Sequence, residues 1–225
     1  MSSRDTVLAS VRRALGVSGQ EAPRRQEVAD RIAGHPRGII PARADLPHAE
    51  QIELFKRMVV GAAGSIDHLA DPSEVPGAVA AYLRARNLPL SVLRGQDARL
   101  ADLPWSSEPT LDVWIGPSDG KQLAGLSHAF AGVAESGTAI MVSGPDNPST
   151  LNLLPDHHLI LVRARDVVGT YEEAWDRLRA AYGPGTMPRT VNWITGPSRS
   201  ADIEQTLLLG AHGPRSLHIL LVGGV

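Results

Sequence analysis

The chain contains no cysteine among its 225 residues. It therefore cannot form a disulfide bond, supply a thiolate nucleophile or bind zinc through cysteine. It also cannot hold an iron–sulfur cluster with thiolates of its own. Because no structural element requires an oxidising compartment, the composition fits a cytoplasmic protein.

Aromatic residues, net charge and long apolar runs are also scarce. Aromatic residues make up 4% of the chain, too few for a stacking platform for single-stranded nucleic acid. The 22 basic and 24 acidic residues give a formal net charge of −2, so we expect neither nucleic acid nor an anionic membrane as a partner. The longest apolar run, residues 217–225, is far below the about 20 residues that span a bilayer. No apolar signal segment follows the polar N-terminus, and we expect a soluble cytoplasmic protein without a membrane span.

Several chemical motifs are missing as well. The chain has no Gly-x-Gly-x-x-Gly fingerprint and no P-loop, which argues against a dinucleotide or nucleoside triphosphate site. It has no Gly-x-Ser-x-Gly nucleophile elbow. No histidines or carboxylates have the spacing of metal ligands, and the adjacent His157 and His158 would point to opposite faces of a strand. We therefore expect neither a metal nor a cofactor.

Residues 1–48 are predicted to form an N-terminal helix and a flexible arm. Apolar residues recur at helical spacing up to Leu15, Ser2 can cap the start of the helix and Gly16 can end it. Residues 16–48 are rich in Pro, Gly, Arg and Ala and show no sustained period, so no further element is predicted there. The segment is either a solvated linker or an arm whose helix docks on a partner.

Residues 49–225 are predicted to form an α/β domain, because strand and helix patterns alternate along them. We expect helices on both faces of a largely parallel sheet. Short apolar runs predict strands at residues 90–93, 111–115, 138–142, 158–162, 191–195 and 217–222. Helical patterns cover residues 49–61, 76–86, 120–129 and 170–181.

Gly-Pro pairs follow three of the predicted strands, beginning at Gly116, Gly144 and Gly196. Proline stops a strand because it cannot donate to the ladder, and glycine permits a close turn. If the strands are parallel, the three turns share the carboxyl edge of the sheet, where open α/β sheets bind ligands. Gly-Pro pairs also serve simply to end strands, and both interpretations stay open.

The turn at residues 196–204 combines hydroxyl groups with an arginine. Ser198, Arg199 and Asp202 lie where a strand is predicted to lead into a helix. Free N–H groups at a helix start, a hydroxyl and a guanidinium together favour a small anion such as a phosphate or carboxylate. Alternatively, Asp202 caps the helix and pairs with Arg199.

Two further residues are candidates for proton transfer. Glu135 is a single carboxylate in an apolar run, at a bend made by Ser136 and Gly137. It could act as a general acid, base or nucleophile, or it could accept backbone N–H bonds that hold the loop. His212 lies between Ala211 and Gly213 just before the last strand, so its ring is expected outside the core, where it can titrate.

Three segments together resemble the LUD-domain family, and within it the lactate utilization protein C branch. Residues 132–138, Gly-Val-Ala-Glu-Ser-Gly-Thr, are similar to that family's Ala-Glu-Thr/Ser-Gly-Thr segment. Residues 152–158 resemble its Pro-x-x-His segment. Residues 196–204 followed by 210–214 resemble its C-terminal signature, and Ser136 stands where threonine is more frequent.

The resemblance implies a three-layer α/β/α sandwich similar to ribose-5-phosphate isomerase and the CoA transferases. It implies a role in an L-lactate utilization system as the member without clusters, beside two iron–sulfur proteins. Carried onto this sequence, it marks the following residues at the carboxyl edge of the sheet: Glu135, Ser136, Thr138, Ser198, Arg199, Asp202, His212 and Gly213. The alternative is a separate enzyme or binder for a carboxylate, sugar phosphate or CoA thioester, using Glu135 and an anion site at residues 196–204.

Overall fold

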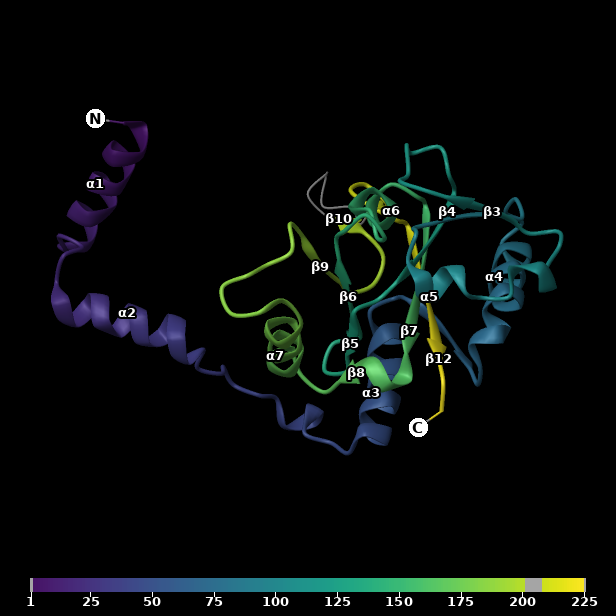
Figure 1. Cartoon of the computed structure of the whole chain (residues 1–225), viewed down its shortest axis with the longest axis horizontal. Coiled ribbons are helices and arrows are strands. Elements are labelled where there is room, and N and C mark those ends of the chain that lie inside the picture. The colour runs from purple at the N-terminus through teal and green to yellow at the C-terminus, as the bar shows by residue number, and fades with distance from the viewer. Residues whose placement is uncertain (1, 201–207, 225) are drawn as a thin grey trace. The chain divides into compact units, whose positions relative to one another are not determined.

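The computed structural model describes residues 2–200 and 208–224, and the chain divides into two compact units (Figure 1). One unit comprises residues 1–39 and the other residues 40–225. The division predicted at residues 48 and 49 stays a prediction. Within the described residues, no helix combines the length and apolar character needed to cross a membrane.

The first unit consists of two helices, α1 (Ser3–Leu15) and α2 (Ala22–Gly34). α1 is confirmed with its predicted ends, because the Ser2 hydroxyl accepts from the Asp5 N–H and Gly16 adopts a φ of 65°. α2 lies in the segment where we predicted no element. Its only large apolar residues are Val28 and Ile32, which are too few to produce a recognisable period. Neither helix buries a single residue.

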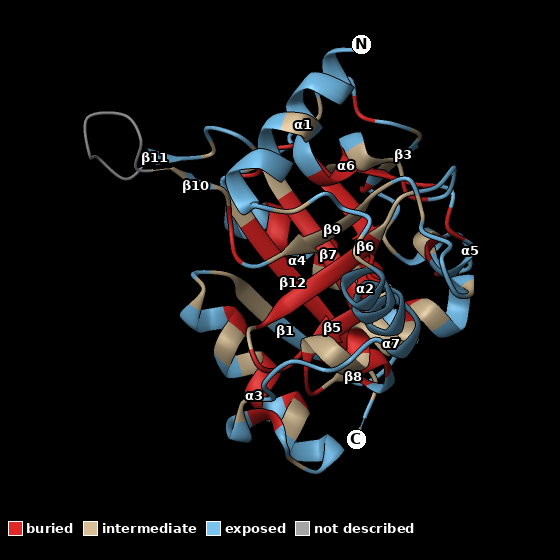
Figure 2. Ribbon diagram, turned by 90° about the vertical axis from the view of Figure 1, so that its left-hand side faces the viewer, coloured by how far each residue is buried: buried red, intermediate tan, exposed pale blue. Residues whose placement is uncertain are grey.

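The second unit is built on a six-stranded sheet in which every neighbouring pair is parallel. In spatial order its strands are β1 (Ser65–Leu69), β12 (Ser216–Val222), β7 (His157–Arg163), β4 (Ala124–His128), β2 (Ser91–Arg94) and β3 (Asp112–Ile115). The central strands are buried on both faces, as Figure 2 shows in red. The predicted α/β class with a largely parallel sheet is confirmed.

Helices cover both faces of this sheet. On one face α4 (Val75–Ala85) packs Val79 and Leu83 against Leu126, together with the short α5 (Ala98–Ala101). On the other face α3 (His48–Gly61) packs Phe55 against Ile160 and Ile219. Burying large aliphatic and aromatic side chains contributes about 1.5–3 kcal/mol each and holds the layers together.

A second sheet lies on the α3 side, in the order β8 (Val167–Val168), β5 (Ala131–Val133), β6 (Thr138–Val142) and β9 (Val191–Ile194). Met141 faces the core shared with α3, whereas Ile140 faces α7 (Tyr171–Tyr182). β6 runs antiparallel to β5 and to β9. The Gly-Pro turns after β6 and β9 therefore lie at opposite ends of this sheet, and the expectation of one shared edge is wrong.

The segment 120–129 is also different from the prediction, because it contains strand β4 rather than a helix. All five residues of β4 are buried. A strand buried on both faces has no alternation of polar and apolar residues, and its Ala, Gly and Leu offer no β-branched signal. β1 was not predicted either. It is an edge strand, and three of its five residues are polar, so it contains no apolar run.

Candidate functional site

A cavity of about 240 Å³ lies where the amino ends of β7 and β12 meet the end of β9 and the helix α6 (Ser149–Leu153). The predicted Ser198, His212 and Gly213 line it together with residues from five separate segments. The remaining lining residues are Asn152, Leu153, His158, Trp193, Ile194, Thr195, Gly196, Pro197, Pro214 and Leu217. Three of the predicted site residues therefore share one wall of this cavity.

That wall is held by hydrogen bonds centred on Ser198. Its N–H donates to the Pro214 carbonyl at 2.8 Å, and its carbonyl accepts from the Gly210 N–H at 3.0 Å. Its hydroxyl accepts from the His212 N–H at 3.3 Å. His212 itself is exposed, as predicted from its neighbours. Ser198 thus joins the turn after β9 to the loop before β12.

A chain of buried polar side chains forms another part of the cavity. The Ser127 hydroxyl on β4 donates to the Asn152 Oδ1 on α6 at 2.9 Å. His158 Nε2 on β7 lies 3.1 Å from the Ser127 Oγ. Burial lowers the pKa of His158 to about 3, so its imidazole is neutral at physiological pH. The predicted opposite facing of His157 and His158 is confirmed, because His157 contacts Tyr82 on α4 instead.

Two atoms of this polar chain have no hydrogen-bond partner. They are His158 Nδ1 and Asn152 Nδ2, and both side chains are at most 1% exposed. An unsatisfied buried polar group typically costs about 1–3 kcal/mol. Both residues belong to the cavity lining, but the two unpartnered atoms themselves are covered by surrounding protein.

Glu135 lies at the predicted bend but is engaged in holding a helix. Its Oε1 accepts the Tyr171 N–H at 2.8 Å, at the first residue of α7, and its side chain is buried. Its own N–H donates to the Gly169 carbonyl at 3.0 Å. From the sequence, Glu135 could either transfer protons or accept backbone N–H bonds that hold the loop, and the contacts match the second alternative. Glu135 is not among the described lining residues of the cavity.

Ser136 and Thr138 belong to a cluster of hydroxyl groups that reaches the cavity wall. Thr138 Oγ1 lies 2.7 Å from Ser136 Oγ, 2.8 Å from the Tyr171 Oη and 2.6 Å from Thr195 Oγ1. Thr195 lines the cavity, whereas the other three do not. Thr138 contacts both Thr195 and Tyr171. These contacts could not be predicted from the sequence, because they join β6 to the residue after β9 and to α7.

Arg199 is a predicted site residue that does not belong to the described lining of this wall. Arg199 lies on β10 (Arg199–Ser200), which pairs with β11 (Leu208–Leu209), and it is exposed. The helix that we expected after this turn would lie outside the described residues. Asp202 falls outside the described residues.

The location of the cavity also corrects the expectation of a carboxyl-edge site. His212 and Gly213 precede β12, so they lie at the amino end of that strand. His158 is the second residue of β7 and pairs in register with Leu217. β9, which leads to Ser198, belongs to the second sheet rather than the parallel one.

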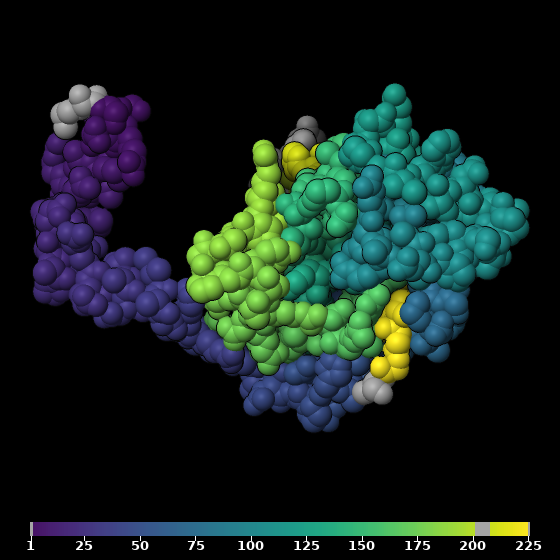
Figure 3. Space-filling model, viewed as in Figure 1, coloured from purple at the N-terminus to yellow at the C-terminus, as the bar shows by residue number. Residues whose placement is uncertain are grey.

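The carboxyl edge of the parallel sheet has basic residues that the sequence reading did not single out. The neighbouring strands β2, β4 and β7 end in Arg94, His128 and Arg163. Burial, with Arg99 nearby, lowers the pKa of His128 to about 4. Arg163 lines a hollow of about 380 Å³ beside residues 222–224, the yellow segment that reaches the surface next to the green segment around residue 163 in Figure 3.

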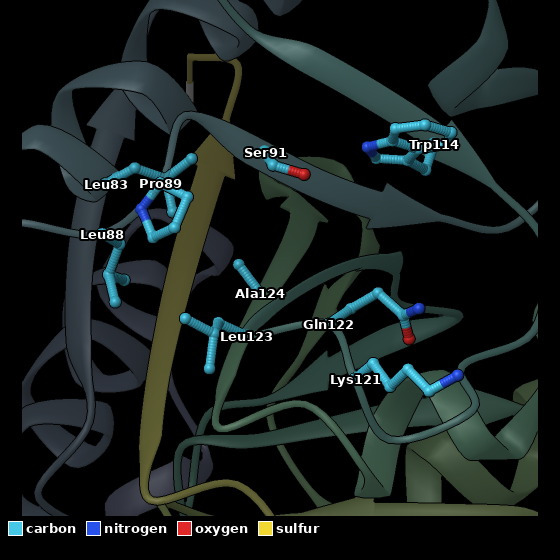
Figure 4. Close-up of a pocket in the computed structure, with 9 residues that line it drawn as sticks. All are labelled: Leu83, Leu88, Pro89, Ser91, Trp114, Lys121, Gln122, Leu123 and Ala124. Atoms are coloured by element: carbon cyan, nitrogen blue, oxygen red, sulfur yellow. The ribbon is translucent and has the colours of Figure 1, made fainter.

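A further hollow of about 390 Å³ lies beside the edge strand β3 (Figure 4). Its lining is mostly apolar, and Lys121 is its one charged lining residue in the described part of the chain. Trp114, Lys121 and Gln122 flank it in the close-up. Because its described lining contains no carboxylate or histidine beside Lys121 and Ser91, we do not assign chemistry to it.

In the described ranges 2–200 and 208–224, no three His, Asp or Glu residues lie together as potential metal ligands, and the expected absence of a metal stays a prediction. The absence of a cofactor stays a prediction.

Comparison with known proteins decides the family. The model of the LUD domain matches residues 109–222. The chain belongs to the LUD domain family. This LUD-domain chain is 31% identical to the lactate utilization protein C of Deinococcus radiodurans over 192 residues, which are 81% of the chain and 84% of that protein.

Two other relatives align over shorter stretches. An uncharacterized protein of Neisseria meningitidis is 38% identical over 60% of the chain and 59% of its own length. The lactate utilization protein C of Bacillus subtilis is 37% identical over 52% of the chain and 53% of its own length. The LUD-domain chain thus spans little more than half of these two relatives.

The fold has a counterpart among solved structures. A DUF162 family protein from Deinococcus radiodurans superimposes with a TM-score of 0.61 at 25% identity. The match covers 79% of this LUD-domain chain and 99% of that structure. The three segments that suggested the family in sequence all lie within residues 109–222, which the LUD domain model matches. The resemblance is therefore confirmed.

Proposed function

We propose that the chain serves in the oxidation of L-lactate to pyruvate as the component that carries no iron–sulfur cluster. A role in a lactate utilization system is supported by the relatives named lactate utilization protein C, one of which aligns over 81% of the chain. That long alignment is the observation that carries the proposal. The finer assignment is supported by the complete lack of cysteine, since clusters are held by cysteine thiolates.

In this proposal, iron–sulfur proteins of the same cytoplasmic system accept the two electrons that leave L-lactate, and the two protons pass to solvent. The N-terminal helices suit a docking role. Val7, Val11 and Leu15 are exposed on α1, and Val28 and Ile32 are exposed on α2. Short helices with uncovered apolar stripes gain stability when they pack on another protein.

Co-purification tests the proposal. The chain is co-expressed with the iron–sulfur proteins of its lactate utilization system, and one of these proteins carries the affinity tag. We expect the full chain to co-purify and a variant lacking residues 2–39 to co-purify less. Full-length chain that is folded but absent from the purified complex would contradict the proposal.

The alternative, a separate binder of small molecules, is favoured by a different observation, the cavity lined by His158 and Asn152. From the sequence, this alternative would use Glu135 and an anion site at residues 196–204. Glu135 accepts the Tyr171 N–H and Arg199 is exposed, so these two residues support this alternative less than the cavity does.

A further inference from the structure

Two arginines line the hollow of about 380 Å³ beside residues 222–224. Arg163 ends β7 and pairs in register with Val222 of β12, and Arg165 follows two positions later. The two arginines are the only charged residues in the described lining, which otherwise consists of Pro72, Ala164, Val222, Gly223 and Gly224. The hollow lies where two central parallel strands end, at the edge where open α/β sheets bind ligands.

Both guanidinium groups are open to solvent. Arg165 is an exposed residue. Arg163 is half-buried, but none of its nitrogens is among the atoms that are both covered and without a partner. Within residues 2–200 and 208–224, neither side chain forms a hydrogen bond or an ion pair. Both guanidinium groups therefore remain available to an anion.

The acidic residues that are closest in sequence to the hollow are engaged elsewhere. Asp166 follows Arg165 directly, but its carboxylate bonds to Arg177 on α7. Asp71 and Glu74, beside the lining residue at position 72, accept backbone N–H groups of their own turn at 2.8 and 2.9 Å. None of these three carboxylates belongs to the described lining, so the two arginines have no counter-charge in the hollow.

Two uncompensated guanidinium groups favour a doubly charged anion. Arginine binds carboxylate and phosphate oxygens through paired N–H donors. A carboxylate carries one negative charge, whereas a phosphate monoester carries about 1.5–2 at pH 7 and so matches two arginines. The volume of the hollow falls within the about 300–1,000 Å³ of small-molecule sites. Pro72 and Val222 supply apolar surface for the rest of such a molecule.

We propose that this hollow binds a phosphate dianion, free or as the phosphate group of a small monoester, through Arg163 and Arg165. Gly223 and Gly224 leave room for it, because a Cβ at either position would meet no atom within 4 Å. Gly223 is held in place by its N–H, which donates to the Leu69 carbonyl at 2.9 Å. The proposal goes beyond the proposed function and does not rest on it.

Ligand-observed NMR on the full chain, at pH 8 and constant ionic strength, tests the proposal with inorganic phosphate, phenyl phosphate and acetate. We expect saturable binding of both phosphates and at least tenfold weaker binding of acetate, whose single charge matches only one arginine. Tighter binding of phenyl phosphate than of inorganic phosphate would identify a monoester as the ligand, and equal binding would identify free phosphate. Acetate binding as tight as phosphate binding, or no saturable phosphate binding, would overturn the proposal.

Variants locate the binding. Arg163→Gln and Arg165→Gln each remove one guanidinium group, and we expect each to weaken phenyl phosphate binding at least tenfold. Arg57→Gln is the matched control, because Arg57 is an exposed arginine on α3 that does not belong to the described lining of the hollow. It should bind phenyl phosphate like the unmodified chain. Unchanged binding by folded Arg163→Gln and Arg165→Gln, or an equal loss in Arg57→Gln, would contradict the assignment.

A spectroscopic measurement keeps the proposal testable if Arg163→Gln does not fold. The ¹H–¹⁵N signal of the Arg163 Nε is identified in the unmodified chain by its absence from Arg163→Lys. We expect this signal to move on addition of phenyl phosphate and to stay in place with acetate at the same ionic strength. An Arg163 signal indifferent to phenyl phosphate would overturn the proposal. Because no partner protein is present, this failure would leave the co-purification result, and so the proposed function, untouched.

Discussion

At the scale of single residues, the buried histidines make the stability of the fold dependent on pH. Burial lowers the pKa of His158 to about 3 and the pKa values of His128 and His218 to about 4. Between pH 6.5 and 4.5 the unfolded chain therefore binds more protons than the folded one. The free energy of unfolding is therefore highest above about pH 6.5, the pKa of a histidine in the unfolded chain. It decreases as the pH falls toward the lower pKa values of the folded chain.

We expect the free energy of unfolding, measured with urea, to fall over this range by about 1.4 kcal/mol per pH unit for each histidine. His158→Gln should reduce this pH dependence by the contribution of one histidine, about 1.4 kcal/mol per pH unit. An identical slope for His158→Gln and the unmodified chain would contradict the assignment of a neutral buried imidazole.

Glu135 provides a second test at this scale. Because its carboxylate accepts the first N–H of α7, Glu135→Gln should lower the free energy of unfolding by about 0.5–2 kcal/mol, as other helix caps do. The measurement is urea unfolding at pH 7. If stability is unchanged while a lactate-dependent activity of the assembled system is lost, Glu135 has a chemical role instead of a structural one.

The residues of the site were partly predictable. Ser198, His212 and Gly213 stand in a recognisable segment, and the structure brings them to one wall. Ser127 was not predictable, because a lone serine in a buried strand has no pattern. Asn152 and His158 lie in the segment 152–158 that resembles the family, but the sequence did not mark them as site residues. Their meaning comes from contacts between residues 25 and 31 positions apart.

At the scale of elements, two glycines fix how the second sheet approaches α3. Gly196 has a φ of 70°, and a Cβ there would meet the Ala62 carbonyl oxygen at 2.1 Å. Gly137, at the start of β6, would likewise meet the Val59 nitrogen at 2.4 Å. Both turns therefore need the missing side chain in order to contact the helix end closely.

We expect Gly196→Ala to lower the free energy of unfolding by about 2 kcal/mol or more, because it combines a left-handed backbone with a steric clash. Gly144→Ala, at another of the three Gly-Pro turns, is the matched control. A Cβ at Gly144 meets nothing within 4 Å, so its stability should change by less than about 1 kcal/mol. Equal effects of the two substitutions in thermal or urea unfolding would contradict this account.

The elements themselves were predicted best where an apolar face is one-sided. Helices α3, α4 and α7 were predicted because each has a polar face and a buried face. β4 was mistaken for a helix because it is buried on both faces. The pairing of β6 and β9 in a separate antiparallel sheet depends on contacts that no local pattern encodes.

At the scale of the whole molecule, the two units should differ in their contribution to stability. Residues 2–39 bury no side chain in α1 or α2, whereas Ala44 is 1% exposed and Leu46 accepts a hydrogen bond from the Gln51 amide. Deleting residues 2–39 should leave the melting temperature nearly unchanged.

Extending the deletion to residues 2–48 should lower the free energy of unfolding by about 1 kcal/mol or more, since buried apolar surface is lost. Calorimetry of the two truncated chains measures the difference. A large loss of stability in the shorter deletion would show that α1 and α2 pack on the domain.

The family assignment extends the account to a system of proteins. The LUD domain is shared with relatives named lactate utilization protein C, and the complete lack of cysteine supports the proposal that other chains carry the clusters. The sequence alone suggested this role through its three segments. It could not show that the resulting site lies at the amino ends of β7 and β12, because that location depends on the sheet order.

The most direct measurement of the central claim is L-lactate oxidation by the co-expressed iron–sulfur proteins, with and without this chain. The account predicts that pyruvate formation depends on the chain and is restored when the purified chain is added back. Full oxidation of L-lactate in its absence would contradict the claim.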